Sequence, residues 1–181
     1  MIHISENIQL QNITIKDHTK LVSLLEKIYP PAYKHLWKQE DYSFYINKFF
    51  SKENLQKELK DVNADYFFVL YKSEQVGIFR IKYNCEFADQ PNASSSYIHR
   101  IYLGENAQGK SVAKSLFYWA ETQCKQKGNN LIWLKAMDSQ KQALRFYEKQ
   151  GYIFSSKIKL DFNLIHEHLR GMHILYKPLT T

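Results

Sequence analysis

The first third of the chain carries apolar residues at the three- and four-residue spacing of amphipathic helices. A helix is predicted to begin after Asp17, which is suited to cap it, and to end at Pro30 and Pro31, with an apolar face of Leu21, Leu24, Leu25 and Ile28. A second helical stretch is expected from about Glu40. A third is expected after Ser51, with an apolar stripe made of Leu55, Leu59 and Val62.

The rest of the chain alternates between strand and helix patterns. β-branched and aromatic runs, bounded by turn residues, predict strands at 11–15, 66–71, 76–83, 97–103, 131–136, 152–160 and 172–176. The second and third of these are joined by four polar residues, as expected of a hairpin. Helices are predicted at 109–127 and 139–150, each followed by a glycine. The order strand, helix, strand, helix, strand is typical of an α/β protein.

Length and composition favour one globular unit. We expect residues 1–181 to form a single domain, because this length supports one core and no internal repeat is visible. Hydrophobic residues make up 44% and charged residues 24% of the chain. The aromatic content of 15% can serve an aromatic core or a stacking surface for a nucleotide or nucleic acid, and the core is favoured.

Cysteine usage predicts a protein of a reducing compartment, and hydropathy predicts no membrane-spanning segment. Cys85 and Cys124 are too few for a disulfide framework and lack the spacing of a zinc site. No apolar run has the length of a membrane span, and the first ten residues do not resemble a signal peptide. We therefore expect a cytoplasmic protein.

The net charge of +7 indicates an anionic partner, which can be nucleic acid, an acidic membrane face or a phosphorylated cofactor. Residues 99–149 hold nine Lys or Arg against four acids, so the anion site is expected in the second half of the chain. There, a strand at 98–103 leads through small residues to the start of a long helix. Such a turn directs free backbone N–H groups and the positive end of the helix dipole outward, which suits a pyrophosphate. An ordinary strand-to-helix loop is the alternative.

A second motif follows the next strand, and the two together resemble the GNAT superfamily of N-acetyltransferases. The first motif is matched by Gln108 and Ala113, with Ser111 where the family has Gly. The second is matched by Ala143, Phe146, Tyr147, Glu148, Lys149, Gly151 and Tyr152, with Gln140 where the family has Asn. The resemblance implies a central mixed, mostly antiparallel sheet flanked by helices, an α/β (α+β) fold.

The resemblance also implies acetyl-coenzyme A (acetyl-CoA) as cosubstrate and an amine of a small molecule or peptide as acceptor. Coenzyme A would be bound by Ile101, Tyr102, Leu103, Gln108, Gly109, Lys110, Ser111, Val112, Ala113, Gln140, Ala143, Phe146 and Lys149. In the family the strand that holds the first three of these offers backbone N–H groups to the pantetheine arm and the thioester carbonyl, and dimers are common.

Two side chains are candidates for catalysis. Tyr147 would protonate the departing thiolate, because its phenol is a proton donor at neutral pH and the resemblance places it beside the sulfur. His99 has the ordinary pKa of a base that acts near neutrality. The alternatives are a core tyrosine and a buried strand histidine.

The acceptor stays open at this point. Residues 51–84 resemble the branch that includes bacterial spermidine/spermine acetyltransferases, so a polyamine is one candidate. A chain of net charge +7 repels a polycation, so an acidic pocket would be needed, drawn from Glu53, Glu58, Glu86 or Asp89.

Three alternative interpretations concern a metal site, acyl-CoA binding without catalysis, and nucleic-acid binding. His166 and His168 lack a third ligand in register, so no metal is expected. A non-catalytic acyl-CoA-binding protein and a basic nucleic-acid-binding module are the competing classes. The sequence contains no recognised nucleic-acid-binding motif, and its basic residues alternate with acids, so nucleic acid is not expected as a partner.

Overall fold

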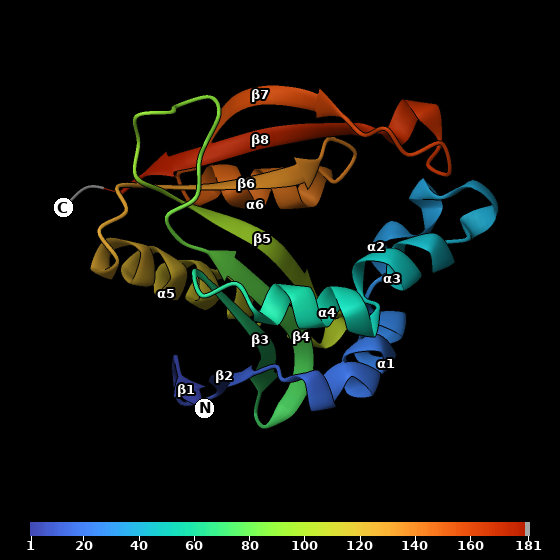
Figure 1. Cartoon of the computed structure of the whole chain (residues 1–181), viewed down its shortest axis with the longest axis horizontal. Helices are drawn as coiled ribbons and strands as arrows, with labels where there is room; N and C mark the ends of the chain where they lie inside the picture. Colours follow the sequence, from blue (N-terminus) through green and yellow to red (C-terminus); the bar gives the residue numbers. More distant parts are fainter. Residues whose placement is uncertain (180–181) are drawn as a thin grey trace.

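The computed structural model describes residues 1–179 and is built on an eight-stranded sheet (Figure 1). The strands are β1 (Ile2–His3), β2 (Ile8–Asn12), β3 (Ala64–Tyr71), β4 (Glu74–Lys82), β5 (Ser95–Leu103), β6 (Leu131–Met137), β7 (Ile153–Lys159) and β8 (Gly171–Pro178). Their order in the sheet is β1-β2-β3-β4-β5-β6-β8-β7, and only β5 and β6 pair in parallel. The predicted mixed, mostly antiparallel sheet is thereby confirmed.

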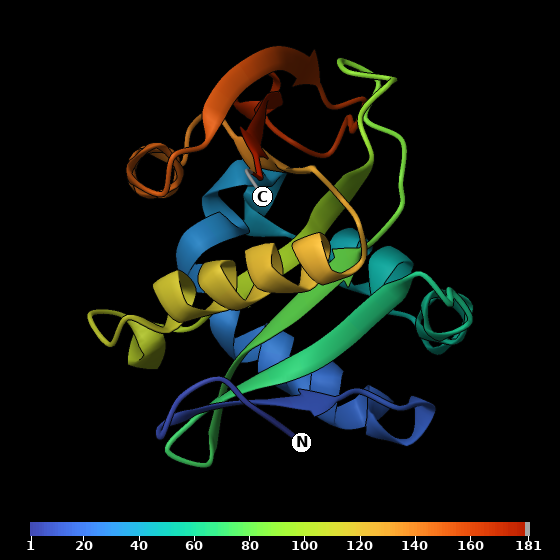
Figure 2. The same ribbon diagram turned by 90° about the vertical axis from the view of Figure 1, so that its left-hand side faces the viewer.

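In the described part of the chain, six α-helices cover the sheet: α1 (His18–Ile28), α2 (Pro30–Tyr33), α3 (Ser43–Phe49), α4 (Lys52–Leu59), α5 (Val112–Gln126) and α6 (Lys141–Lys149). Alternate residues of the strands face different helices. Phe67 and Val69 of β3 belong to the core beneath α5, whereas Phe68 and Leu70 pack with α1, α3 and α4. Figure 2 shows α5 crossing one face of the sheet with the first helices behind it. None of the helices in residues 1–179 is long and apolar enough to cross a membrane.

The two parallel strands at the centre separate halfway along their length. β5 pairs with β6 only from Ser95 to Ile98, and its remaining residues pair with β4 alone. The β4–β5 register also shifts here, because Arg80 lies opposite Arg100 and Ile81 lies opposite Ile98, which leaves His99 as the extra residue of a β-bulge. A bulge bends and twists its strand, so β5 turns away from β6 and opens a gap between them (Figure 1).

Most predicted elements are confirmed within a few residues, and the exceptions have local causes. The first predicted strand lies at Ile8–Asn12, because the Asp17 carboxylate accepts hydrogen bonds from the backbone N–H (2.8 Å) and the hydroxyl (2.7 Å) of Thr14 and bends the chain into a helical turn. Asp17 precedes α1 without capping it. By contrast, Ser51 caps α4 as predicted, since its Oγ accepts from the Asn54 N–H at 3.1 Å.

Two other expectations were wrong. The pattern predicts Val62 on the apolar stripe of a helix, but α4 ends at Leu59 and Val62 is 95% exposed. The long helix after β5 begins at Val112 instead of residue 109, because Gly109 (φ 68°) and Ser111 (φ 58°) both have left-handed backbones that a helix cannot contain. Residues 108–111 therefore form a distinct turn in front of α5.

Candidate active site

Two adjoining cavities lie where β5 and β6 separate. The first, which we call the α5 cavity, has a volume of about 450 Å³ and runs between the turn at 108–111 and α6. The second, the aromatic cavity, has a volume of about 200 Å³ and lies between β5, β6 and the first helices. The residues that line both are Tyr33, Ile101, Gln140, Ala143 and Tyr147. The cavities therefore meet along these side chains.

The α5 cavity brings together most of the residues predicted to bind coenzyme A. It is lined by Ile101, Leu103, Gln108, Gly109, Ser111, Val112, Ala113, Gln140, Ala143 and Phe146. The left-handed turn before α5 leaves the N–H groups of the first helical turn without intrahelical partners, at the positive end of the helix dipole. Ser111 occupies the N-cap position, but its hydroxyl does not cap the helix. The Lys114 side chain supplies a positive charge at the same wall.

Three predicted residues lie elsewhere. The Lys110 ammonium lies 4.8 Å from the centroid of the Tyr71 ring, outside both cavities, and Lys149 lines neither of them. Tyr102 directs its side chain into the aromatic cavity, where its hydroxyl is hydrogen-bonded to that of Tyr45. Neighbouring residues on β5 point to opposite faces, so Ile101 and Leu103 reach the α5 cavity and Tyr102 does not.

Sequence reasoning also missed part of the α5 cavity. Phe117 and Gln150 line it, each four residues after a predicted member, Ala113 and Phe146. Helical spacing could have identified both. Tyr33 could not have been found in this way, because α2 reaches the cavity only through the packing of the first helices against β5.

Tyr147 lies on α6 at the junction of the two cavities. Its ring packs against Phe117, with centroids 5.6 Å apart, and against Phe146 at 5.7 Å. Burial raises the pKa of the phenol to about 12. The hydroxyl consequently keeps its proton across the physiological pH range.

Gln140 closes the same junction from the start of α6. Its side-chain amide donates a 2.7 Å hydrogen bond to the carbonyl of Ala32. This bond ties α6 to α2, and Gln140 lines both cavities. The residue at this position therefore connects the two walls of the site.

His99 lies on the bulge of β5 at the edge of the aromatic cavity. Its Nδ1 is 2.6 Å from an Arg80 guanidinium nitrogen, which can only donate, so the imidazole accepts at Nδ1 and carries its proton on Nε2. Burial, followed by the charges of Arg100 and Arg80, lowers the pKa of His99 to about 2. An imidazole with this pKa is neutral at pH 7 and is a very weak base.

The arginines beside His99 belong to a buried ion-pair network. The Arg100 guanidinium donates to the Glu58 carboxylate and lies 4.6 Å from the centroid of the Phe50 ring. Arg80 is 3.9 Å from the same carboxylate and 3.6 Å from that of Asp61. Glu58 is thus shared by two buried cations and joins α4 to the sheet.

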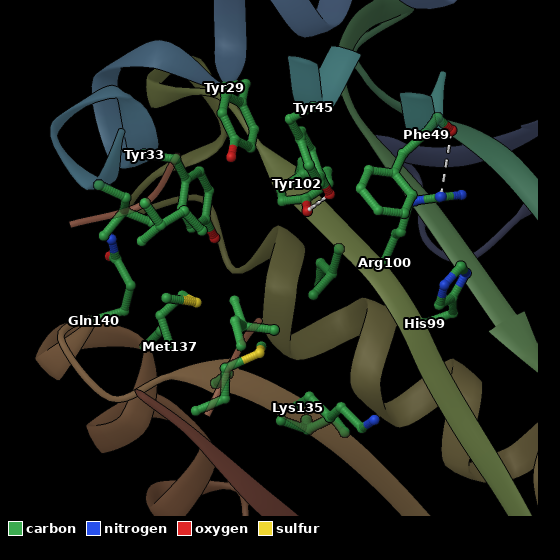
Figure 3. Close-up of a pocket in the computed structure, with 18 of the residues that line it drawn as sticks. Tyr29, Tyr33, Tyr45, Phe49, His99, Arg100, Tyr102, Lys135, Met137 and Gln140 are labelled. Atoms are coloured by element: carbon green, nitrogen blue, oxygen red, sulfur yellow. Dashed lines mark hydrogen bonds between the residues drawn. The ribbon is translucent and has the colours of Figure 1, made fainter. Parts of the chain in front are cut away.

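Stacked tyrosines form one wall of the aromatic cavity (Figure 3). The Tyr29 ring is stacked between those of Tyr33 and Tyr45, with centroids 4.9 Å away in each case, and Tyr102 meets Tyr29 edge-on at 5.7 Å. Figure 3 shows Met137 and Lys135 of β6 across the cavity from these rings. Part of the aromatic content that was assigned to the core therefore surrounds a cavity.

The two neighbouring histidines near the end of the chain, His166 and His168, lie with ring centroids 5.8 Å apart. Within residues 1–179, His, Cys, Asp and Glu side chains form no group of three or more that could hold a metal ion.

The sequence matches the acetyltransferase (GNAT) family over residues 20–152. One relative, an N-acetyltransferase from the pepI 3′ region of Lactobacillus delbrueckii subsp. lactis, is 19% identical over 144 residues, which cover 80% of this chain and 83% of the relative.

Two solved structures illustrate the likeness of the fold. The PaiA N-acetyltransferase from Thermoplasma acidophilum in complex with coenzyme A is 20% identical, with a TM-score of 0.70 and coverage of 94% of this chain and 98% of that one. The spermidine N-acetyltransferase from Vibrio cholerae in complex with coenzyme A and spermine is 16% identical, with a TM-score of 0.69 and coverage of 97% of both chains. The family match spans well over half of the chain, its strands and helices are those expected of the family, and the protein is therefore a member of the acetyltransferase (GNAT) family, whose cosubstrate is acetyl-CoA.

Proposed function

We propose that this protein transfers the acetyl group of acetyl-CoA to the primary amine of a small molecule or peptide, by direct attack in a ternary complex, and that residues 1–181 act as a single domain. The observation that carries this proposal is the junction of two cavities at Tyr147. A two-substrate transfer needs two binding spaces that share one reacting point. The α5 cavity would hold acetyl-CoA and the aromatic cavity would hold the acceptor.

Charge and backbone geometry support the α5 cavity as the cofactor site. The N–H groups at the start of α5 and the Lys114 ammonium offer donors and positive charge to a pyrophosphate. From there the pantetheine arm would run along Ile101 and Leu103 of β5, whose edge toward β6 is unpaired beyond Ile98. An N–H on this free edge can also stabilise the oxyanion that forms at the thioester carbonyl.

The acceptor must reach the thioester as a neutral amine, because a free alkylammonium with a pKa near 10.4 has no lone pair. His99 is too weak a base, with its pKa near 2, to hold the proton of an ammonium group. We propose that the aromatic cavity itself favours the neutral amine, since desolvation lowers the pKa of an amine. The ammonium group of the acceptor would then lose its proton to solvent on entering the cavity, and no general base in the protein would be needed.

The transfer forms a bond between the amine nitrogen and the carbonyl carbon, breaks the bond between that carbon and sulfur, and moves one proton from nitrogen to sulfur. A phenol with a pKa near 12 is a weaker acid than a thiol with a pKa near 8.5. Tyr147 would therefore donate a hydrogen bond to the developing thiolate while the acidic nitrogen supplies the proton. This role needs the hydroxyl and not only the ring.

The experiment is a thiol-release assay with acetyl-CoA, a panel of amines and the variant Tyr147→Phe. We expect a kcat lower by about a hundredfold, the low end of the cost of removing one hydrogen-bond donor from a developing negative charge, with coenzyme A affinity unchanged in calorimetry. Tyr118→Phe is the matched control, because Tyr118 is 75% exposed on α5. An unchanged kcat in Tyr147→Phe would make it a packing residue. A protein that binds acetyl-CoA but acetylates no amine would instead be a non-catalytic acyl-CoA-binding protein.

A further inference from the structure

The aromatic cavity has walls of a particular chemical kind. Aromatic rings form much of its lining. They come from α2, α3, the residue that joins α1 to α2, the segment between α2 and α3, and the segment after β7: Tyr29, Tyr33, Trp37, Tyr45, Phe49 and Phe162. Several of the polar atoms on these rings are already bonded, since Trp37 donates to the Tyr29 hydroxyl at 3.0 Å and Tyr45 shares a hydrogen bond with Tyr102. What the walls offer a ligand is mainly ring surface.

The charged groups around this cavity are cationic. Arg100 and Lys135 line it, and no carboxylate among residues 1–179 does. Glu58 accepts a hydrogen bond from the cavity-lining Arg100 and lies 3.9 Å from Arg80, so the charges of this carboxylate and of Arg100 offset each other. Asp89, another acid considered for a polyamine, accepts hydrogen bonds from Ser155 and Ser156 and lines neither cavity. A ligand with several ammonium groups would find no anionic partner.

The size of the cavity also limits the ligand. A volume of about 200 Å³ compares with the roughly 150 Å³ of a dry protein cavity that holds one benzene molecule. One six-membered aromatic ring and a short chain therefore fill it. A chain of two carbons would carry the amine from the rings of Tyr29 and Phe49 toward Tyr147, where the α5 cavity begins.

We propose that the acceptor is a monoamine whose body is a single aromatic ring, an arylalkylamine, and that polyamines are poor acceptors. This inference rests on the proposed function. Ring stacking and edge-to-face contacts with the tyrosine wall bind the body of such a molecule. Its single amine reaches Tyr147, where the two cavities meet, in the neutral form. The bound ligand therefore leaves no ammonium group buried in the aromatic cavity. A polyamine would keep one or two ammonium groups in the cavity beside Lys135. Arg100 and Glu58 already form an ion pair, so neither is available to such a ligand, and the attraction of ring faces for a cation is offset by its desolvation and by the charge of Lys135.

The first measurement is binding of 2-phenylethylamine and of spermidine to the protein saturated with coenzyme A, which cannot transfer an acetyl group. Calorimetry is expected to show binding of 2-phenylethylamine at least tenfold tighter than that of spermidine. Equal or tighter binding of spermidine would overturn the inference. Because this measurement needs no turnover, the inference and the proposed function can fail separately.

The second measurement is kcat/KM in the thiol-release assay, where 2-phenylethylamine is expected to exceed spermidine at least a hundredfold. Should neither amine be acetylated while 2-phenylethylamine alone binds, the proposed function fails and the acceptor class stands. Should spermidine be the better substrate, the acceptor class is wrong and the proposed function stands.

A pair of variants then tests the charge argument. Met137 lines the cavity opposite the tyrosines, so Met137→Glu adds a carboxylate and Met137→Gln adds a polar group of similar size without charge. Relative to Met137→Gln, the Glu variant is expected to bind spermidine at least tenfold tighter and 2-phenylethylamine no tighter. If both variants bind spermidine equally, charge does not select the acceptor and the inference is wrong.

The ring contacts are tested by Phe49→Leu, which keeps an apolar side chain but removes the ring at the end of α3. Its affinity for 2-phenylethylamine is expected to fall about fivefold or more. Phe154→Leu is the control, because Phe154 is 50% exposed on β7 and lines neither cavity. Equal losses in the two variants, or none in Phe49→Leu, would contradict recognition by the aromatic wall.

Discussion

Among single residues, Ser111 shows how this chain forms the turn before α5 with serine where the family has glycine. The family resemblance has glycine here, and the structure gives a physical reason, because φ is +58° and a left-handed backbone costs a residue with a Cβ about 1–2 kcal/mol. Ser111 accepts this cost without using its hydroxyl as a cap. The turn keeps its shape, and the wall of the α5 cavity that it forms is in place.

Substitution of Ser111 tests the phosphate-binding role of this turn. Ser111→Asp is expected to weaken coenzyme A binding at least tenfold in calorimetry, since a carboxylate near the pyrophosphate adds a repulsion of about 1–3 kcal/mol. Ser111→Gly relieves the left-handed strain, so it should bind at least as tightly as the parent and raise the free energy of unfolding by about 0.5–1 kcal/mol. Ser73→Asp is a matched control, because Ser73 has φ +68° in the β3–β4 turn, outside the cavity. An equal affinity in Ser111→Asp and the parent would remove the pyrophosphate from this turn.

His99 predicts a specific pH dependence of stability. Its pKa is about 2 in the folded protein and near 6.5 in the unfolded chain, so below pH 6.5 the unfolded state binds a proton that the folded state does not. Stability is therefore lost as the pH falls through this window. Between pH 7 and pH 5 this single group contributes a loss of about 2 kcal/mol.

Chemical denaturation at these two pH values measures the effect. His99→Gln, which can still accept a hydrogen bond from Arg80, is expected to lose about 2 kcal/mol less than the parent between pH 7 and pH 5. The exposed His35 supplies the comparison variant His35→Gln. If His99→Gln and the parent lose the same free energy, His99 is not held neutral by its surroundings.

At the scale of elements, the contact between β4 and β5 decides how the site is placed. A Cβ at Gly77 would lie 2.3 Å from the carbonyl oxygen of Tyr102 and 3.2 Å from the Cα of Leu103. Both are backbone atoms, so they can yield only if β5 itself moves. β5 carries the wall shared by the two cavities, and the absence of a side chain at Gly77 lets it approach β4 so closely.

Gly77→Ala is therefore expected to lower the free energy of unfolding by about 1–3 kcal/mol, the usual cost of overpacking, and to raise KM for acetyl-CoA as β5 shifts. Thermal denaturation and the thiol-release assay measure the two effects. Glu74→Ala, at the exposed start of the same strand, controls for a small change in β4. A fully stable and active Gly77→Ala protein would mean that the two strands separate without consequence for the site.

At the scale of the whole molecule, the charge distribution proved a coarse guide. The excess of basic residues between positions 99 and 149 pointed to an anion site in that half, and the α5 cavity lies there. Yet of the lysines near the start of α5, only Lys114 lines this cavity. Lys110 lies against Tyr71, and at the other end of α5 the Lys127 ammonium lies 4.6 Å from the Tyr83 ring centroid. The net charge describes the electrostatic potential around the whole molecule, whereas the position of each charged side chain depends on how that side chain packs.

Local sequence patterns were sufficient to predict most helices and strands and the residues of the turn before α5 and of α6. Periodicity of two and of about 3.6 residues depends on which side chains are apolar, so it located the strands and helices to within a few residues. Gln108, Ser111 and Ala113 are close along the chain, and their turn is a local structure. The segment holding Phe146 and Tyr147 was found because its motif is also local.

Which cavity a side chain lines, and which charged groups lie beside it, depend on contacts between elements that are far apart in the sequence. His99 has the sequence context of a base, but the guanidinium groups of Arg80 and Arg100 and burial deprive it of that ability, and Arg80 comes from a different strand. The aromatic cavity joins α2 and α3 to β5 and β6. Its contacts span long stretches of chain, with 57 residues between Tyr45 and Tyr102 and 108 between Ala32 and Gln140. Contacts across such distances follow from the packing of helices on the sheet and from the separation of β5 and β6, and neither leaves a local pattern in the sequence.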